Sequence, residues 1–203
     1  MEFGPLKIRL YGDPCLRARS KPVKQVGPVE RMLIAAMFET VNVNKGVGLA
    51  APQVGINEQI FVVNTGKEIL TVVNPKILKS MGSEVMQEGC LSIPCPPDDV
   101  KRSKTSGYAV MEEGCLSIPH LLVDVRRPKT VWVEFIDGEN RRLQAQLNGL
   151  LARVFQHEYD HLQGKLILDY LPPKDRARVV SQIKDGSYTG KVLGNDDGNT
   201  SKI

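Results

Sequence analysis

The segment that most constrains this chain is residues 148–163, with the sequence NGLLARVFQHEYDHLQ. Asn148 is a favoured residue type at a helix N-cap, and Gly164 suits the position just past a last helical turn, so we predict a helix between them. His157 and His161 lie four residues apart. On a helix, both imidazoles therefore project from one face and can share one cation.

The glutamate between the two histidines needs a partner. Glu158 follows the apolar line of Leu151 and Phe155 around the helix, where an unpaired charged carboxylate is strongly unfavourable. A water molecule activated by the cation would give Glu158 a proton to accept. The HExxH motif also arises by chance on amphipathic helices, but two of the chain's three histidines lie on this face, which favours a metal site.

The third metal ligand must come from another segment, because a catalytic site of this kind normally has three protein ligands and one open position. A zinc protease would take its third ligand from a histidine or glutamate after the helix, but no residue after Gly164 suits that role. The cysteine of an EGCLS segment is the better candidate. Four cysteines are too few for a disulfide framework in 203 residues, so we expect free thiols at Cys15, Cys90, Cys95 and Cys115.

The EGCLS segment occurs twice, because residues 79–105 recur, 25 positions later, as residues 104–130. Two copies are too few for a repeat fold, so we predict an insertion in a globular domain. A strand-like sequence follows Cys115, whereas prolines and aspartates that break a strand follow Cys90. We therefore predict that Cys115 binds the metal, that residues 81–105 form a surface loop, and that Cys90 is a free thiol.

The remaining patterns predict one α+β domain. A chain of 203 residues with 41% apolar residues can bury one substantial core. Apolar residues at helical spacing predict a helix over residues 29–41. Strands are predicted over residues 59–63, 70–73, 121–125, 130–135 and 141–146, with a hairpin turn at Asp137 and Gly138. We expect small mixed or antiparallel sheets packed around the central metal-binding helix.

We place the end of the catalytic domain at residue 172, so that residues 173–203 form a basic helix and a polar tail. From about Asp185 the composition predicts disorder. The basic residues of this helix suit a ribosome contact, although a solvated face is the commoner explanation; they are Lys174, Arg176, Arg178 and Lys184. A net charge of +4 and the absence of a long apolar run predict no membrane span and no sequence-specific nucleic-acid partner.

Three segments in this order resemble the signature motifs of the peptide deformylase family: GVGLAAPQ (46–53), EGCLS (113–117) and HEYDHL (157–162). YGDPCLR (11–17) is similar to the N-terminal segment of the same family, and the resemblance covers about residues 5–172. The spacing between Cys115 and His157 also matches the family. The spacing between Asn74-Pro75 and Cys90 matches it too, so by spacing alone either copy could reach the metal. The resemblance implies removal of the formyl group from N-formylmethionyl nascent chains, with release of formate.

The resemblance also implies the roles of single residues. Cys115, His157 and His161 would hold Fe²⁺, with Ni²⁺, Co²⁺ or Zn²⁺ as substitutes. Glu158 would be the general acid and base, and the Gln53 side chain with the Leu116 backbone N–H would bind the oxyanion. The expected substrate-binding residues are Gly46, Val47, Gly48, Leu49, Glu113, Gly114 and Val154. A plain tight turn is the alternative explanation of Gly46 and Gly48.

Two other functions remain open from the sequence. One is a zinc endopeptidase built on the same helix motif, and the other is an inactive deformylase homologue that only binds nascent chains or ribosomes. We expect a monomer in the bacterial cytoplasm or an organelle matrix, since no secretory segment is visible. His120 is predicted to be a strand-edge residue without a metal role, and Asp160 at most orients other groups of the site.

Overall fold

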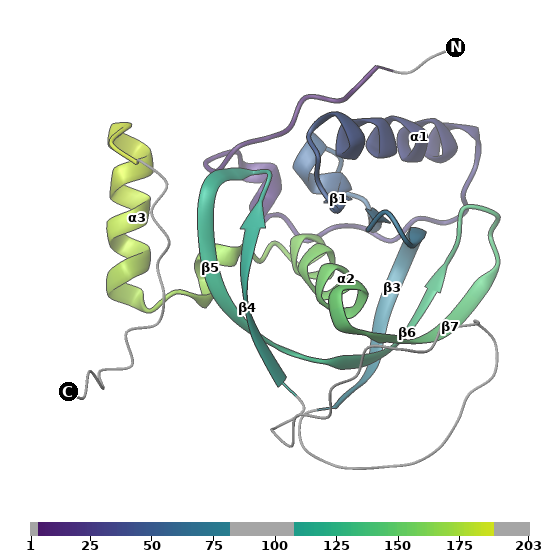
Figure 1. Ribbon diagram of the computed structural model, residues 1–203. Coiled ribbons are helices and arrows are strands. Elements are labelled where there is room, and N and C mark those ends of the chain that lie inside the picture. The colour runs from purple at the N-terminus through teal and green to yellow at the C-terminus, as the bar shows by residue number, and fades with distance from the viewer. Residues whose placement is uncertain (1–3, 82–107, 189–203) are drawn as a thin grey trace.

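The computed structural model describes residues 4–81 and 108–188, which contain seven β-strands and three α-helices (Figure 1). The strands are β1 (Gly48–Ala50), β2 (Ile60–Asn64), β3 (Ile69–Met81), β4 (Tyr108–Cys115), β5 (Ile118–Pro128), β6 (Thr130–Ile136) and β7 (Arg142–Asn148). The α-helices are α1 (Pro28–Val43), α2 (Gly149–Leu162) and α3 (Pro173–Asp185), and the 3-10 helices are η1 (Pro14–Arg17), η2 (Ala51–Val54) and η3 (Ile167–Tyr170).

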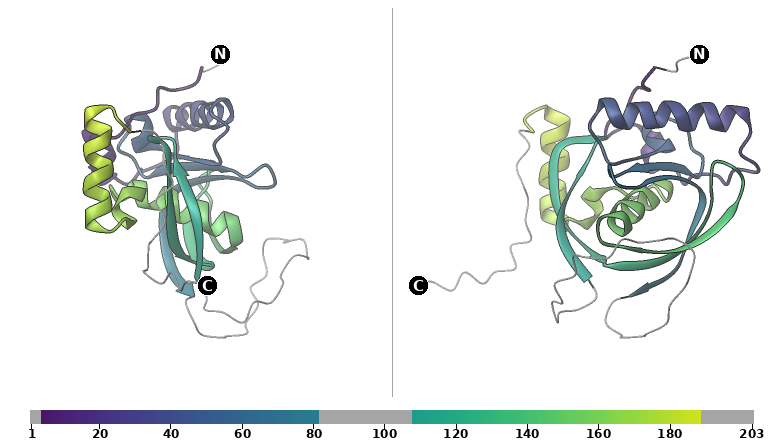
Figure 2. Two further views of the ribbon diagram at one scale, coloured as in Figure 1. Left: turned by 60° about the vertical axis from the view of Figure 1, so that its left-hand side comes forward. Right: turned by 45° about the vertical axis from the view of Figure 1, so that its right-hand side comes forward.

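The strands form two antiparallel sheets. The larger sheet has the order β1-β2-β3-β6-β7, and β4 pairs with β5 in a second sheet of two strands. Only Lys129 separates β5 from β6, so one curved stretch of chain joins the two sheets. Figure 2 shows both sheets curving around α2, with α1 on the opposite face of the larger sheet. The expected α+β fold around a central helix is confirmed.

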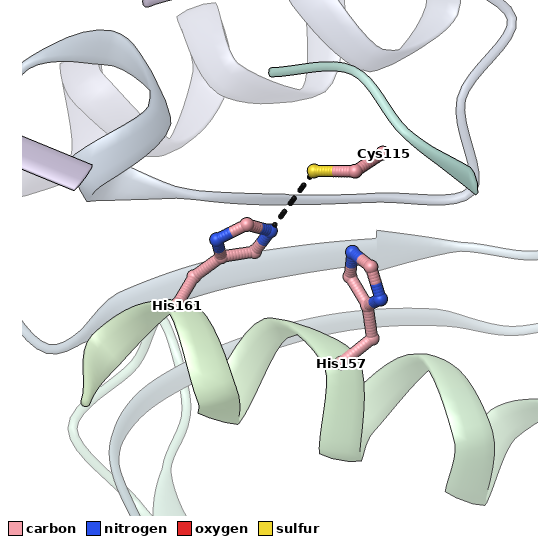
Figure 3. Close-up of side chains that lie close together, drawn as sticks. All are labelled: Cys115, His157 and His161. Carbon is pink, nitrogen blue, oxygen red and sulfur yellow. Dashed lines mark hydrogen bonds between the residues drawn. The ribbon is translucent and has the colours of Figure 1, made fainter. Parts of the chain in front are cut away.

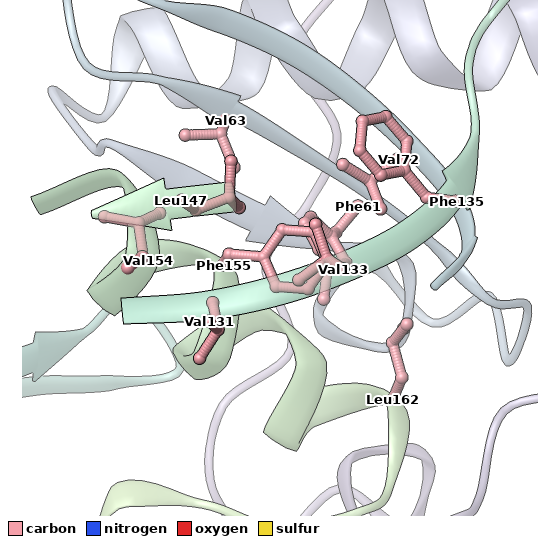
Figure 4. Close-up of a cluster of buried hydrophobic side chains, with 12 residues drawn as sticks. Phe61, Val63, Val72, Val131, Val133, Phe135, Leu147, Val154, Phe155 and Leu162 are labelled. Carbon is pink, nitrogen blue, oxygen red and sulfur yellow. The ribbon is translucent and has the colours of Figure 1, made fainter. Parts of the chain in front are cut away.

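The main core lies between α2 and the larger sheet. Phe155 of α2 packs edge-on against Phe61 of β2, with ring centroids 5.0 Å apart, and against Phe135 of β6 at 6.3 Å (Figure 4). Val131 and Val133 of β6 close the cluster and are fully buried. This packing fixes the rotation of α2, because one apolar face must meet the sheet while the opposite face turns toward the β4–β5 hairpin.

A second apolar layer lies between α1 and the other face of the same sheet, where Ile60, Val62 and Leu49 are fully buried. The helix begins with Pro28 at its first position, and the Glu30 carboxylate accepts a hydrogen bond of 2.8 Å from the Gly27 N–H. The predicted helix over residues 29–41 is confirmed within two residues at each end.

A third cluster joins β5 to η3 and α3. Leu121, Val123 and Val125 of β5 share one buried face with Leu168 of η3 and Val179 of α3. The basic C-terminal helix therefore exists and packs on the domain. The predicted boundary at residue 172 stays a prediction, and most of the polar tail, residues 189–203, lies outside the described residues. None of the described helices has the length and apolar character that a membrane span requires.

The two strands that flank the duplicated segment meet the same stretch of chain. Met81 at the end of β3 pairs with Thr130, and Tyr108 at the start of β4 pairs with Pro128. The predicted loop over residues 81–105 lies outside the described residues apart from Met81, and so do Cys90 and Cys95. Met81 and Tyr108 therefore pair with residues that are only two positions apart in the chain, on either side of Lys129.

The ends of α2 agree with the sequence in position but not in every contact. Gly164 has φ 72°, and the Gly164 and Lys165 N–H groups donate to the carbonyls of His161 and Asp160, which is a Schellman ending. Asn148 is the N-cap residue, but its side chain makes no cap. Its Oδ1 accepts a hydrogen bond of 2.7 Å from the Thr130 hydroxyl instead, because Asn148 also ends β7 beside Thr130.

Candidate active site

Two histidines of α2 and one cysteine of β4 converge (Figure 3). The donor atoms of Cys115, His157 and His161 all lie within 4.8 Å of one another. Cys115 Sγ is 3.3 Å from His161 Nε2, and the two imidazole centroids are 5.0 Å apart. The helix supplies the second and third donors at one-turn spacing, as the sequence predicted.

Cys115 reaches this point because it ends β4 at an irregular turn. The β4–β5 ladder is regular from Tyr108 to Gly114, and the register then shifts so that Cys115 pairs with Ile118. The shift re-aims the last side chain of the strand, as bulges commonly do next to active sites. Within the described residues Cys15 and Cys115 are both free cysteines, but Cys15 belongs to η1 and is not one of the three converging donors.

A divalent transition metal fits this donor set. One thiolate and two imidazoles are the ligands that zinc and iron accept in catalytic sites, with a further position left open. Burial lowers the pKa of His161, and the neighbouring His157 lowers it further. The neutral imidazole that this favours is the form that binds metals.

Glu158 is buried beside the three donors. Only 4% of the residue is exposed, and its Oε2 has no hydrogen-bond partner within the described part of the chain. Burial raises the pKa of the Glu158 carboxyl to about 7. A carboxyl group with this pKa can both accept and return a proton near neutral pH.

Gln53 of η2 faces the same point with its amide nitrogen. The Ala50 N–H donates to Gln53 Oε1 at 2.8 Å, which fixes the orientation of the amide. Gln53 Nε2 then lies 3.5 Å from Cys115 Sγ and 3.3 Å from Ser117 Oγ. The amide nitrogen of Gln53 therefore faces the converging donors, and its oxyanion role stays a prediction.

A cavity of about 570 Å³ opens onto these groups. Most of the predicted site residues line it: Gly46, Val47, Gly48, Gln53, Glu113, Gly114, Cys115, Leu116, Val154, His157 and Glu158. Leu49 does not line it. Side chains alternate along β1, so Gly48 faces α2 while Leu49 is buried in the cluster beneath α1. The Leu49 side chain therefore does not face the cavity, and a substrate-binding role for Leu49 stays a prediction.

Glu113 was predicted to bind substrate, but its carboxylate is engaged inside the protein. Arg127 donates to it twice, at 2.6 and 2.9 Å, and Arg153 donates once at 2.6 Å. Its Oε2 also lies 3.0 Å from His157 Nδ1. Burial opposes ionisation, but the hydrogen bonds from His157 and Arg127 lower the pKa of Glu113 to about 2.

Sequence reasoning missed Arg127, Arg153 and Tyr170, which belong to this buried network. Two signals were available. Arg127 continues the inward face of Leu121, Val123 and Val125 on β5, and Arg153 interrupts the apolar face of α2. A cation at an inward position needs a buried anion as partner.

His120 and Asp160 lie outside the group of converging donors. His120 is an exposed residue of β5 with φ 66° at the cavity wall, and it is not one of the three converging donors. Asp160 accepts hydrogen bonds from Arg127 at 2.9 Å and from the Tyr170 hydroxyl at 2.7 Å. These hydrogen bonds connect Asp160 to the Arg127 cluster and not to the side chains of the metal-binding group.

A helix carrying HExxH, cradled by antiparallel sheets and facing a cysteine at the end of a hairpin, defines the class of single-metal hydrolases. A family model described as polypeptide deformylase matches residues 5–106 and 103–177 of the sequence. The chain belongs to the peptide deformylase family. The two matches meet inside the repeat, as expected if one copy completes the N-terminal match and the other begins the C-terminal match.

Known relatives agree over nearly the whole chain. A peptide deformylase of Thermotoga maritima is 37% identical over 186 residues, which cover 91% of this chain and 98% of the relative. The crystal structure of peptide deformylase from the same species has a TM-score of 0.68 at 38% identity, with 83% of this chain and 99% of that chain covered. A peptide deformylase from Synechococcus elongatus, solved in complex with actinonin, has a TM-score of 0.73 at 32% identity, covering 96% and 93%.

Proposed function

We propose that this enzyme hydrolyses the N-formyl amide of N-formylmethionyl nascent polypeptides and releases formate. The observation that carries the proposal is the convergence of Cys115, His157 and His161 beside the buried Glu158, at the wall of an open cavity. The metal that we propose is Fe²⁺, with Ni²⁺, Co²⁺ or Zn²⁺ as substitutes, since thiolate and imidazole suit all four. Nascent substrates would place the enzyme near ribosomes, in a bacterial cytoplasm or an organelle matrix.

The residues divide the chemistry between them. A divalent cation held by the three side chains would supply Lewis acidity toward the formyl oxygen and toward water. Glu158 accepts the proton that the attacking water loses and delivers it to the departing amine nitrogen. The Gln53 amide and the Leu116 backbone N–H donate hydrogen bonds to the oxygen on which negative charge develops.

The cavity suits a methionine side chain. Three apolar residues that line it are about half exposed: Val47 at 45%, Met111 at 49% and Leu150 at 50%. An apolar substrate side chain would cover them. β1 is the edge of the larger sheet, and Gly46 and Gly48 line the cavity, so an extended peptide in the cavity can pair beside this strand.

Formate release from formyl-Met-Ala-Ser tests the proposal, with free Met-Ala-Ser and an internal-bond peptide as comparison substrates. We expect release from the formylated peptide, loss of release when a chelator removes the metal, and recovery with Fe²⁺ or Ni²⁺. Glu158→Ala should retain the metal but lower kcat about 10²–10⁴-fold, because the proton carrier is lost.

Each alternative gives a different result in the same assay. Cleavage of internal peptide bonds without regard to the formyl group would show an endopeptidase. Metal binding without turnover by the wild-type protein would show an inactive homologue. Normal turnover by Glu158→Ala would remove this residue from the mechanism.

A further inference from the structure

A cluster of buried charge that the reaction does not use surrounds Arg127. Its guanidinium donates to both oxygens of Glu113, to Asp160 Oδ2 at 2.9 Å and to the Tyr170 hydroxyl at 3.0 Å. The Arg127 side chain is 4% exposed and that of Glu113 is 5% exposed. A fork of this kind, with several partners at once, holds its acceptors in fixed relative positions.

The cluster joins all the elements that carry metal ligands. Arg127 belongs to β5 and Glu113 to β4, two residues before Cys115. Asp160 lies on α2 beside His161, and Tyr170 ends η3. Arg127 therefore ties the hairpin to the helix at the same level at which the cysteine and the histidines meet.

One contact leads from the cluster to a ligand atom. Glu113 Oε2 lies 3.0 Å from His157 Nδ1. An ionised Glu113 accepts a hydrogen bond there, so it favours the tautomer with the proton on Nδ1 and leaves Nε2 as the donor atom for a cation. Arg127 holds both oxygens of the Glu113 carboxylate in place. The position of this carboxylate in turn decides which nitrogen of His157 is left to bind a cation.

Burying this many charges is costly, and the same space filled with apolar side chains is often as stable. The cluster is therefore better explained by the geometry that it imposes than by stability. We propose that Arg127 is a positioning residue for the metal site, acting through Glu113 on His157 and through Asp160 on α2. The proposal rests on the function proposed above, since it requires that the site binds a divalent cation.

The test compares the cation affinity of purified variants. Arg127→Met keeps an unbranched aliphatic stem in the cluster and leaves Glu113 with Arg153 and His157, so we expect the protein to fold. Its dissociation constant for Zn²⁺, measured by competition with a chelator, should rise about 10–100-fold, the usual effect of losing a group that orients a metal ligand. The visible spectrum of the Co²⁺ form should change as well, because the ligand orientation changes.

Arg17→Met is the matched control. Arg17 also makes a two-pronged contact with a carboxylate, to Asp169 at 2.6 and 3.2 Å, and it acts on a metal ligand only through its charge, which lowers the pKa of His161. We expect its Co²⁺ spectrum to equal that of the wild type and its Zn²⁺ affinity to change far less than that of Arg127→Met, whatever happens to its Tm. Wild-type affinity and spectrum in Arg127→Met would overturn the proposal, even with a lowered Tm.

Glu113→Gln provides a second measurement that does not depend on the folding of Arg127→Met. The substitution keeps the shape but places an amide N–H₂ against either Arg127 or His157, so weaker Zn²⁺ binding is expected. Unchanged affinity in this variant would also overturn the proposal. Failure of the wild-type protein to bind Zn²⁺ or Co²⁺ would instead contradict the proposed function, which keeps the two conclusions separate.

Discussion

Gly48 faces α2 at a position that has no room for a side chain. A Cβ atom there would lie 2.9 Å from Val154 Cγ1 and in collision with Glu158 Oε1. Gly48→Ala should therefore displace the Glu158 carboxylate and lower formate release strongly. The accompanying loss of stability should be about 1–3 kcal/mol, the usual cost of overpacking. Enzyme kinetics and urea denaturation measure the two effects.

Gly138→Ala is the control for this prediction. The nearest atom to its added Cβ would be 3.7 Å away, in Thr71, which is ordinary van der Waals contact. We expect wild-type activity and stability from this variant. If Gly48→Ala retained full activity, the close approach of β1 to Glu158 would have no part in catalysis.

The site residues of α2 were predictable from local sequence patterns. Site residues that depend on contacts between distant segments were not. His157, Glu158 and His161 follow from helical spacing within five residues, which the sequence displays directly. The direction of the Leu49 side chain was not predictable, because it depends on where β1 begins. The partners of Arg127 come from β4, α2 and η3, and no local pattern can assign them.

At the scale of elements, the inward face of β5 distinguishes the two copies of the repeat. Leu121 and Val123 are each 1% exposed in the cluster beneath α3. The first copy has Pro96 and Asp98 at the equivalent positions. Proline lacks the side chain that fills the cluster at Leu121, and the next residue of the first copy, Pro97, stands where Leu122 pairs with Gly114 of β4. An unpaired aspartate is costly in an apolar cluster. These positions support the choice of Cys115 over Cys90.

The cysteine variants test that choice directly. Cys115→Ser should weaken Zn²⁺ binding far more than Cys90→Ser, because serine replaces a thiolate ligand in the first variant and a thiol without a ligand role in the second. Chelator competition on both purified proteins measures the difference. The opposite ranking would assign the metal to the first copy.

Val123→Asp gives the second copy of the repeat the residue that the first copy has at the equivalent position, Asp98. We expect a loss of unfolding free energy of about 3–5 kcal/mol, as for an uncompensated buried charge. Leu122→Asp on the half-buried, opposite face of β5 is the control and should cost less. Urea denaturation monitored by circular dichroism measures both. Equal losses would mean that the two faces of β5 do not differ in burial as described.

Most helices and strands were predictable because each has its own periodicity. The two strands that were missed, β1 and β4, do not. β1 is three residues long and consists of glycine, leucine and alanine, which have little strand preference apart from the leucine. β4 includes two adjacent glutamates and a glycine, Glu112 to Gly114, and it is specified by its pairing with β5. Tertiary pairing decides such strands, so a single sequence does not reveal them.

For the whole molecule, the positions of Met81 and Tyr108 define a sharp experiment. They pair with Thr130 and Pro128, so one residue suffices to connect them opposite Lys129. Deleting residues 82–106 leaves Gly107 in that place and removes 25 residues, one period of the repeat. We expect this variant to fold, to bind Zn²⁺ and to release formate at a rate close to that of the wild type.

Deleting residues 82–107 is the control, since it removes one residue more. Met81 and Tyr108 would then be adjacent and could not keep both pairings, and a slip of one residue turns every side chain of a strand to the other face. This variant should have a clearly lower Tm and weaker Zn²⁺ binding. If the shorter deletion were the inactive one, the pairing on either side of Lys129 would not describe the working enzyme.

The position between Met81 and Tyr108, opposite Lys129, is also a place where this fold can accept inserted residues. Any sequence whose ends can meet across one residue spacing can be spliced between β3 and β4, since lengthening a connection costs only about 0.6 kcal/mol for each doubling. A gene that gains a second hairpin copy there still encodes a complete enzyme. The spare copy is then released from selection for packing, and Pro96 and Asp98 are substitutions of the kind that such freedom permits.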